Sequence, residues 1–336
     1  MKVLFNTATK RSFGLVMLLV FLSLLFIMSM KLGVHHTTWK NIISTFTQFN
    51  NSNEHIIIRD VRFPRSLIAI AVGASLGIAG ALLQVLTRNP LADTGILGIN
   101  GGASLFVVMA TTLFSVSSLT QYTWIAFLGA AVFGSIVYVL GQTTKSEHSP
   151  IRLTLAGAAI AAFTMSLTNA FLVIDESGLQ EVLLWVSGSI AGREMDMLLN
   201  ILPYMVIGWV GSILIATKMD ALMLGENIAK SLGQNTIWVK ATMGVLVILL
   251  AGSAVAIAGP VAFVGLVIPH IAKYMVGLHS RWIILYSGVL GGCLLLISDL
   301  FSRLIAMPRE LPIGATTALI GVPVFVYIAR KGKYTS

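Results

Sequence analysis

Arginine and carboxylate side chains gather where two apolar stretches meet polar sequence. Arg62 and Arg65 are three positions apart at the start of one stretch, a spacing that places both on one side of a helix. A second group lies at the far end of the chain: Asp299, Arg303, Arg309 and Glu310. These residues could form an Asp299–Arg303 i,i+4 pair, with the other arginines snorkelling along apolar surface. Alternatively, their planar guanidinium groups could bind carboxylates of a partner in a bidentate manner.

The segment 218–233 is the second candidate site. It alternates apolar and charged residues at helical spacing between two glycines, which predicts a short amphipathic helix. Such a helix can lie along a membrane surface or fit a groove in another protein, and the pattern alone leaves both open. The residues that could make the contact are Leu224, Gly225, Glu226, Ser231, Leu232 and Gly233.

Several kinds of chemistry have no sequence signature in this chain. There is no phosphate-binding G-x-x-x-x-G-K-[ST] loop, no H-E-x-x-H and no G-x-S-x-G, so neither ATP hydrolysis nor another catalytic activity is expected. The single cysteine, Cys293, excludes a disulfide within the chain, and no metal site or cofactor is expected. The apolar stretches lack central carboxylates, which argues against ion-coupled secondary transport, and no channel selectivity filter is visible.

The composition identifies the elements that must position these residues. The 336-residue chain is 56% hydrophobic and only 10% charged, whereas soluble domains carry about 25% charged residues. Eight stretches of 17 or more residues contain no Asp, Glu, Lys or Arg, and one helical crossing of a bilayer takes about 20 residues. The chain is therefore predicted to be an all-α, polytopic membrane protein, and its net charge of +9 does not indicate a nucleic-acid partner.

Two of the long stretches must each contain a turn, one at residues 115–122 and one at Gly259-Pro260. These cuts give about ten helices, with both termini cytoplasmic. That orientation places 14 Lys and Arg residues inside and 8 outside, as the positive-inside rule requires. Glycines four apart, as at Gly73 and Gly77, predict close helix packing. The predicted helices are 12–30, 66–87, 95–114, 124–142, 152–174, 197–217, 239–258, 261–277, 282–301 and 311–329.

From about residue 55 onward, the chain resembles FecCD-type permease subunits, which belong to ATP-driven importers of iron–siderophores, haem and cobalamin. Each single motif is weak evidence for the family, but the order and spacing of all of them together are specific to it. The resemblance rests on Arg62-Phe-Pro-Arg65, Gly80-Ala-Leu-Leu-Gln84, Arg88-Asn89-Pro90-Leu91-Ala92, Ile96-Leu97-Gly98, Leu224-Gly225-Glu226, Ser231-Leu232-Gly233, Gly259-Pro-Val-Ala-Phe263-Val-Gly265-Leu-Val-Ile-Pro269-His270, Asp299 with Arg303, Glu310-Leu311-Pro312-Ile313-Gly314 and Pro323-Val-Phe325.

The resemblance implies the fold of a type II ABC importer permease, with residues 1–336 as a single transmembrane domain in the cytoplasmic membrane of a bacterium. It implies four kinds of partner: an ATP-binding cassette ATPase dimer, an extracytoplasmic substrate-binding lipoprotein, a second permease subunit (identical or homologous) and the lipid membrane. The expected substrate is a ferric siderophore, with cobalamin or haem as the alternative within the family.

The resemblance also assigns roles to residues. Arg62, Arg65 and Arg303 match the outer arginines on which the binding protein docks. In the cytoplasmic coupling loop 218–240, the residues that match those contacting the ATPase are Leu224, Gly225, Glu226, Ser231, Leu232 and Gly233. Ser149, Pro150 and Ile151 match the region of the cytoplasmic gate, although Pro150 and Ile151 depart from its usual small, hydroxylated residues. Thr94 and the pair Arg193-Glu194 also depart from the family pattern.

Overall fold

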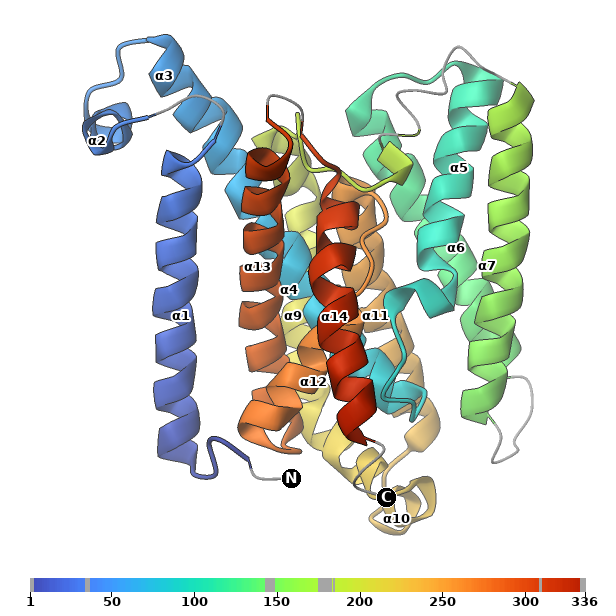
Figure 1. The fold of residues 1–336 in the computed structure, drawn as a ribbon. Coiled ribbons are helices and arrows are strands. Elements are labelled where there is room, and N and C mark those ends of the chain that lie inside the picture. Colours follow the sequence, from blue (N-terminus) through green and yellow to red (C-terminus); the bar gives the residue numbers. More distant parts are fainter. Residues whose placement is uncertain are drawn as a thin grey trace.

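The part of the chain that the structure describes is all-helical. The computed structural model describes residues 3–33, 37–142, 149–174, 183, 185–307 and 310–332. The long helices run side by side between two ends of a bundle (Figure 1). The helices are α1 (Ala8–Lys31), α2 (Trp39–Thr47), α3 (Asn53–Ile56), the π-helix η1 (Ile57–Arg62), α4 (Phe63–Leu86), the 3-10 helix η2 (Thr94–Leu97), α5 (Ile99–Phe114), α6 (Leu119–Gln142), α7 (Ser149–Ile174), α9 (Met195–Met223), α10 (Glu226–Ser231), α11 (Thr236–Ala258), α12 (Val264–Val276), α13 (Ser280–Ile305) and α14 (Ile313–Gly332).

Seven helical segments among the described residues are long and apolar enough to cross a membrane. Three further apolar helices, α5, α12 and the described part of α14, are shorter. Each predicted range falls on one of these ten helices. The short helices lie at the ends of the bundle, α2 and α3 at one end and α10 at the other (Figure 1). These ends are called the α2 end and the α10 end below, and α1 begins and α14 finishes at the α10 end.

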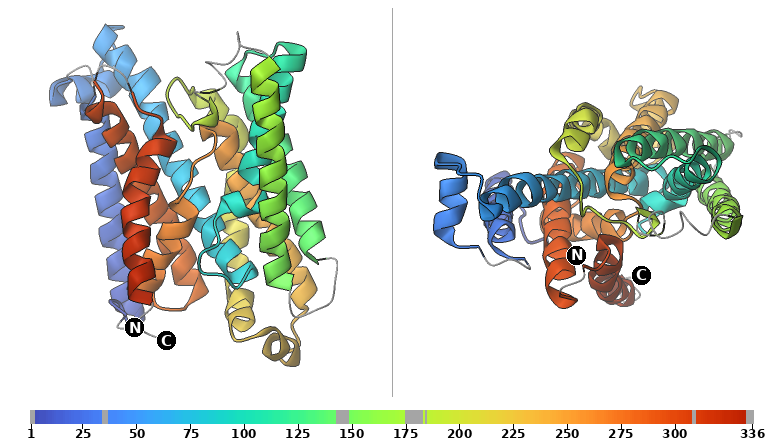
Figure 2. Two further views of the ribbon diagram at one scale, coloured as in Figure 1. Left: turned by 45° about the vertical axis from the view of Figure 1, so that its right-hand side comes forward. Right: turned by 90° about the horizontal axis from the view of Figure 1, so that it is seen from above.

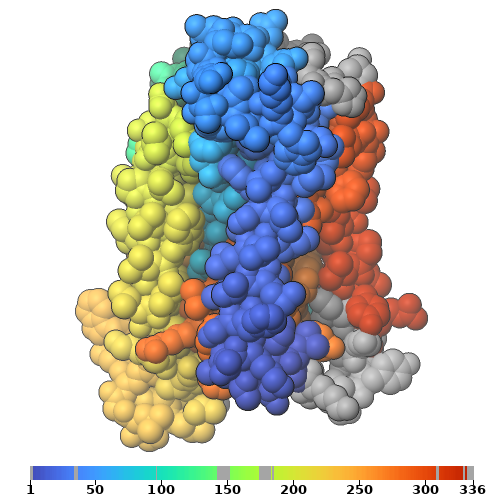
Figure 3. All heavy atoms as spheres, turned by 90° about the vertical axis from the view of Figure 1, so that its left-hand side faces the viewer, coloured from blue at the N-terminus to red at the C-terminus, as the bar shows by residue number. Residues whose placement is uncertain are grey.

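The centre and the periphery of the bundle differ in burial. In α4, 83% of the most apolar window is buried, whereas in α1 the share is only 17%. The α1 helix lies on the outside of the bundle (Figure 3), and its apolar side chains, such as Phe13 and Met17, are exposed. A helix that is apolar on all faces and exposed on one side is expected to face lipid. Figure 2 shows α5, α6 and α7 grouped on one side of the bundle.

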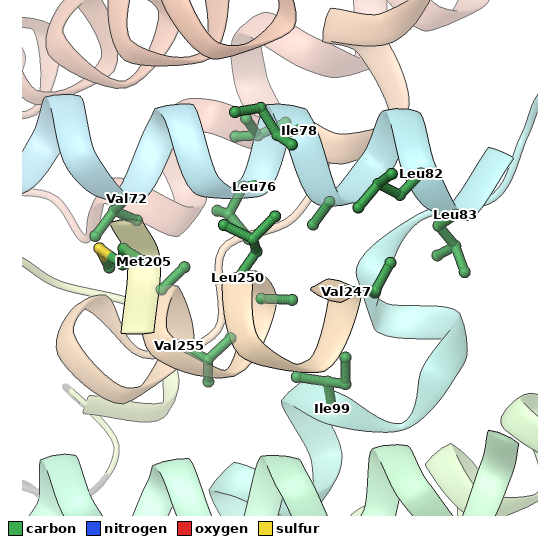
Figure 4. Close-up of a cluster of buried hydrophobic side chains, with 14 of the residues drawn as sticks. Val72, Leu76, Ile78, Leu82, Leu83, Ile99, Met205, Val247, Leu250 and Val255 are labelled. Carbon is green, nitrogen blue, oxygen red and sulfur yellow. The ribbon is translucent and has the colours of Figure 1, made fainter. Parts of the chain in front are cut away.

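The core forms where α4 packs against α11. Val72, Leu76 and Leu82 of α4 face Val247 and Leu250 of α11, with side chains from α5 and α9 at the margin (Figure 4). Beside this core, α4 and α13 approach backbone to backbone. A methyl group at Gly73 would collide with the carbonyl oxygen of Gly291, and one at Gly77 with that of Ser287. The predicted close packing at Gly73 and Gly77 is therefore confirmed.

Several boundaries differ from the prediction, three of them for a clear local reason. The helix predicted at 66–87 does not begin at Ser66 but continues back through η1 and α3 to Asn53. Pro64 has no N–H, and its ring would clash with a carbonyl four residues earlier; the π-helix widens the turns that precede it. The α5 helix starts only at Ile99, because Gly98 adopts a left-handed φ of 68° after η2. The α9 helix extends to Met223, since the charges at Lys218 and Asp220 do not end a helix.

The predicted break at Gly259-Pro260 is confirmed. The α11 helix ends at Ala258 and α12 starts at Val264, after an extended connection. The segment that precedes α9 stabilises the start of this connection, because the Ser189 N–H donates to the Ala258 carbonyl at 2.8 Å. A methyl group at Gly259 would collide with the Trp185 carbonyl oxygen, so glycine is required at this close approach.

Candidate functional site

Several of the charged residues at the α2 end form one largely buried ionic cluster. Arg65, on α4, bridges two carboxylates: its Nε lies 2.7 Å from Asp299 Oδ1 on α13, and its Nη1 lies 2.7 Å from Glu310 Oε2. Arg303 pairs with the other oxygen of Asp299 one helical turn away. The side chain of Asp299 is fully buried, and that of Glu310 is 33% exposed. The predicted Asp299–Arg303 pair is thus confirmed, while Arg309 lies outside the described residues.

Arg62 belongs to the same cluster but is held by different groups. Its Nη1 donates to the carbonyl oxygens of Met30, at 2.7 Å, and Lys31, at 3.0 Å, and to Thr37 Oγ1 at 2.9 Å. Met30 and Lys31 are the last two residues of α1, where helix carbonyls lack intrahelical donors. A cation at the C-terminus of a helix is also favoured by the helix dipole.

All three arginines predicted to dock a partner are almost fully buried in this structure. The exposed fractions are 4% for Arg62, 6% for Arg65 and 3% for Arg303. The structure therefore brings the three predicted residues together, but it turns their guanidinium groups toward internal acceptors. A partner carboxylate would have to exchange with one of these acceptors.

The segment at the α10 end forms a tight helical turn. Gly225 adopts a φ of 125° and a ψ of 148°, and Gly233 a φ of 77°, so both depend on glycine's conformational freedom. Between them lies α10, which confirms the predicted short helix. Leu224, Ile228 and Leu232 expose 66%, 48% and 67% of their surfaces. Ser231 is exposed, and its hydroxyl donates to the Ile228 carbonyl at 2.8 Å.

Glu226 fixes α10 to the helix that follows. Its carboxylate accepts from Lys240 Nζ at 2.6 Å and from Lys230 Nζ at 3.2 Å, and Thr236 Oγ1 lies 3.3 Å away. Burial acts to raise the pKa of Glu226, but the hydrogen bonds and positive charges of the two lysines lower it to about 2. The i,i+4 spacing of Glu226 and Lys230 could have predicted one of these contacts. The contact with Lys240 could not be predicted from local spacing, because it depends on how α10 packs against α11.

Two further charged residues, Arg193 and Asp93, are buried outside the ionic cluster. Arg193 is buried, and its Nε donates only a long bond, 3.4 Å, to the Ser189 carbonyl. Burial lowers the pKa of Arg193 to about 10. Asp93 Oδ1 has no hydrogen-bond partner within the described ranges, and burial raises the pKa of its carboxyl group. Both positions were visible in the sequence, but their burial was not.

The region predicted as a gate begins α7, since that helix starts at Ser149. The side chains of Ser149, Pro150 and Ile151 lie outside the described residues. Within the part of the chain that is described, no three His, Cys, Asp or Glu side chains come together in a group that could hold a metal ion.

The sequence of this chain is similar to those of known proteins over most of its length. The model of the FecCD transport family matches residues 19–331. The chain belongs to the FecCD transport family. A probable siderophore transport system permease protein of Bacillus subtilis strain 168, YfiZ, is 48% identical over 300 residues, which cover 89% of this chain and 90% of that protein. The Fe(3+)-citrate import system permease protein YfmD of the same strain is 37% identical over 334 residues, covering 98% of this chain and 99% of the relative.

A solved structure supports the same assignment. It is described as an inward-facing conformation of a metal-chelate type ABC transporter. The alignment has a TM-score of 0.81 at 26% identity, and it covers 95% of this chain and 98% of the other. The likeness thus extends over nearly the whole chain.

Proposed function

We propose that this chain is the membrane-spanning permease subunit of an ABC importer that carries ferric siderophores across the cytoplasmic membrane. The observation that carries the proposal is the near full-length similarity to permeases named for siderophore and Fe(3+)-citrate transport. In this function the chain performs no covalent chemistry. It supplies the path, while a separate ATPase dimer supplies energy and an external binding protein delivers the chelate.

The proposed topology has ten crossings, with both termini and α10 in the cytoplasm and α2 outside. The seven long apolar helices and the three shorter ones supply ten segments. The 14 to 8 distribution of Lys and Arg supports this orientation. The described helices α1 and α14 start and finish at the α10 end, which agrees with a common side for the two termini (Figure 1).

Arg62, Arg65 and Arg303 are proposed to receive acidic residues of the binding protein at the outer face. The cluster contains three guanidinium groups but only two carboxylates, Asp299 and Glu310, so it carries an excess positive charge. Replacing all three arginines with glutamate is expected to abolish docking while the protein still inserts. Lys40→Glu, at an exposed position of the same end, is the matched control. Unchanged affinity of the triple variant for the binding protein would contradict the dock.

The segment from Leu224 to Gly233 is proposed to contact the ATPase. Its exposed leucines and isoleucine offer an apolar surface at the cytoplasmic end, and an amphipathic helix of this kind fits a groove in a partner. Ser149, Pro150 and Ile151 are proposed to lie at the cytoplasmic gate. A second permease subunit, identical or homologous, would complete the transporter.

The proposed function is tested by affinity purification and transport together. The tagged chain is purified from its own cells in mild detergent, and co-purifying proteins are identified by mass spectrometry. We expect an ATPase and a binding lipoprotein. Uptake of radiolabelled iron as a siderophore complex is then compared with uptake of labelled haem and cobalamin in cells with and without the chain. A chain that purifies alone, or iron uptake that does not depend on it, would overturn the proposal.

A further inference from the structure

The N-terminus of α13 is capped by a residue from another helix. His279, at the N-cap position, makes no side-chain capping bond, although the first N–H groups of a helix have no intrahelical acceptor. Asp220 of α9 supplies the acceptor instead. Its Oδ1 receives the Ser280 N–H at 2.9 Å and the Ser280 hydroxyl at 2.6 Å. Ser280 is fully buried, and a carboxylate at a helix N-terminus is favoured by the helix dipole.

Asp220 also lies in the part of α9 that leads into the coupling segment. The last turn of α9 ends at Met223, two residues before Gly225. The chain that follows α10 folds back onto this turn, because Gln234 Nε2 donates to the Lys218 carbonyl at 3.0 Å. The turn that carries Asp220 is therefore fixed to both sides of α10, and a displacement of α10 must be accommodated there.

The other end of α13 carries the ionic cluster of the outer face. Asp299 and Arg303 both belong to α13, and Asp299 binds Arg65 of α4. Between the two ends, α13 lies against α4 through the glycine contacts at Gly73 and Gly291. Such backbone contacts leave no side chain that could rearrange to absorb a shift, so α13 is expected to move as one body. Figure 1 shows that α13 spans the bundle between the α10 and α2 ends.

We propose that Asp220 is a positioning residue that transmits movement of the ATPase-contacting segment to α13, and through α13 to the outer cluster that docks the binding protein. This inference rests on the proposed function. Asp220 itself touches neither partner in this role. Its two bonds to Ser280 connect the end of α9 to α13, and α13 connects the cytoplasmic end of the bundle to Asp299 and Arg303. A purely structural cap would stabilise α13 without linking the two partners.

The linkage predicts a measurable coupling between nucleotide and docking. If the two faces are coupled, ATP on the ATPase changes the affinity of the binding protein by some factor, and the binding protein changes the affinity for ATP by the same factor. The test uses the full complex of permease and ATPase in lipid nanodiscs. The affinity of the loaded binding protein is measured with and without a non-hydrolysable ATP analogue, and the ratio of the two affinities is the readout.

We expect Asp220→Ala to reduce this ratio at least fivefold toward one, and also to reduce the ratio of stimulated to basal ATP hydrolysis. Ser280→Ala should act in the same direction but less, because the Ser280 N–H can still donate. In the double variant the two effects should not add, since both act through one contact. Asp220→Asn is a second variant that retains an oxygen acceptor of the same shape. Thr217→Ala, an exposed position in the same region of α9, is the matched control and should leave the ratio unchanged.

A wild-type affinity ratio in Asp220→Ala would overturn the inference, even if its thermal stability falls, because the residue would then be only a cap. A ratio that falls equally in Thr217→Ala would also overturn it. If no ATPase associates with the wild-type chain, the proposed function itself fails, and the two failures are thereby distinguished.

Discussion

Arg65 Nε lies 2.7 Å from Asp299 Oδ1, although 234 positions separate the two residues in the sequence. This pair joins α4 to α13 at the α2 end of the bundle, and Arg65 uses a second nitrogen to hold Glu310. The arginines proposed to dock an external partner therefore already have carboxylate partners within the chain. Docking must replace an internal interaction with an external one, so its affinity reflects the difference between the two.

Glu310→Gln is expected to strengthen docking of the binding protein. The Glu310 carboxylate is partly exposed and competes for Arg65, and an exposed ion pair of this kind contributes up to about 1 kcal/mol, or about fivefold in affinity. The affinity is measured in nanodiscs at low and high salt. Glu54→Gln, which lies at the same end and contacts Asn41, should leave the affinity unchanged. Weaker docking of Glu310→Gln would show that Glu310 does not compete.

Asp299→Ala is expected to destabilise the protein strongly. Asp299 is fully buried and pairs with two guanidinium groups, so its removal leaves Arg65 and Arg303 without their shared carboxylate. Breaking a buried pair in this way costs about 3 kcal/mol or more. Thermal unfolding in detergent should show a larger loss for Asp299→Ala than for Glu310→Gln. Equal thermal unfolding midpoints for the two variants would contradict a buried ionic network centred on Asp299.

Much of the fold could be predicted from charge and glycine patterns. The break at Gly259-Pro260 and the close approach at Gly73 follow from local rules, because proline ends a helix ladder and glycine lets backbones meet. The end of α9 could not be predicted in this way. Lys218 and Asp220 end the charge-free stretch, but the helix continues to Met223, since charge indicates where apolar sequence ends and not where helical geometry ends.

The site was predicted by residue type but not by its contacts. Arg62, Arg65 and Arg303, which the family resemblance grouped, lie at the same end of the bundle, and the i,i+4 pair of Arg303 with Asp299 followed from spacing. The bridge from Arg65 to Asp299 and Glu310 connects distant segments, and no local pattern contains this information. The same holds for Arg62, whose acceptors include the carbonyl groups of the last two residues of α1, which every residue type offers equally.

Gly73→Ala is expected to separate α4 from α13. The added methyl group would collide with the carbonyl oxygen of Gly291, which belongs to backbone and cannot turn away. Overpacking of this kind costs about 1–3 kcal/mol, and it should lower the unfolding midpoint in detergent. Gly95→Ala is the control, because its nearest neighbour, Asn100 Nδ2, would lie 3.8 Å from the new methyl group. A larger loss at Gly95 would contradict the close helix contact.

Glu226→Gln is expected to weaken association with the ATPase several-fold by freeing α10 from Lys240 and Lys230. The pKa of Glu226 is lowered to about 2, so its stabilising contribution is complete above the ordinary value of 4.5 and is lost as pH falls toward 2. Co-purification of the ATPase should therefore not decline through Glu226 between pH 8 and about pH 5. A loss of association in this range that Glu226→Gln abolishes would contradict the low pKa.

Gly225→Asn and Gly233→Asn provide a test of the backbone of the coupling segment. Asparagine tolerates the left-handed region, where Gly233 has a φ of 77° and no neighbour within 4 Å of an added Cβ. Gly225, with a φ of 125° and a ψ of 148°, occupies a region that is essentially limited to glycine, and a side chain there costs about 1–3 kcal/mol. We expect Gly225→Asn to reduce iron uptake and ATPase co-purification much more than Gly233→Asn does, at equal amounts of inserted protein. If Gly233→Asn is the more harmful of the two, contact with the partner and not backbone strain must decide what this segment tolerates.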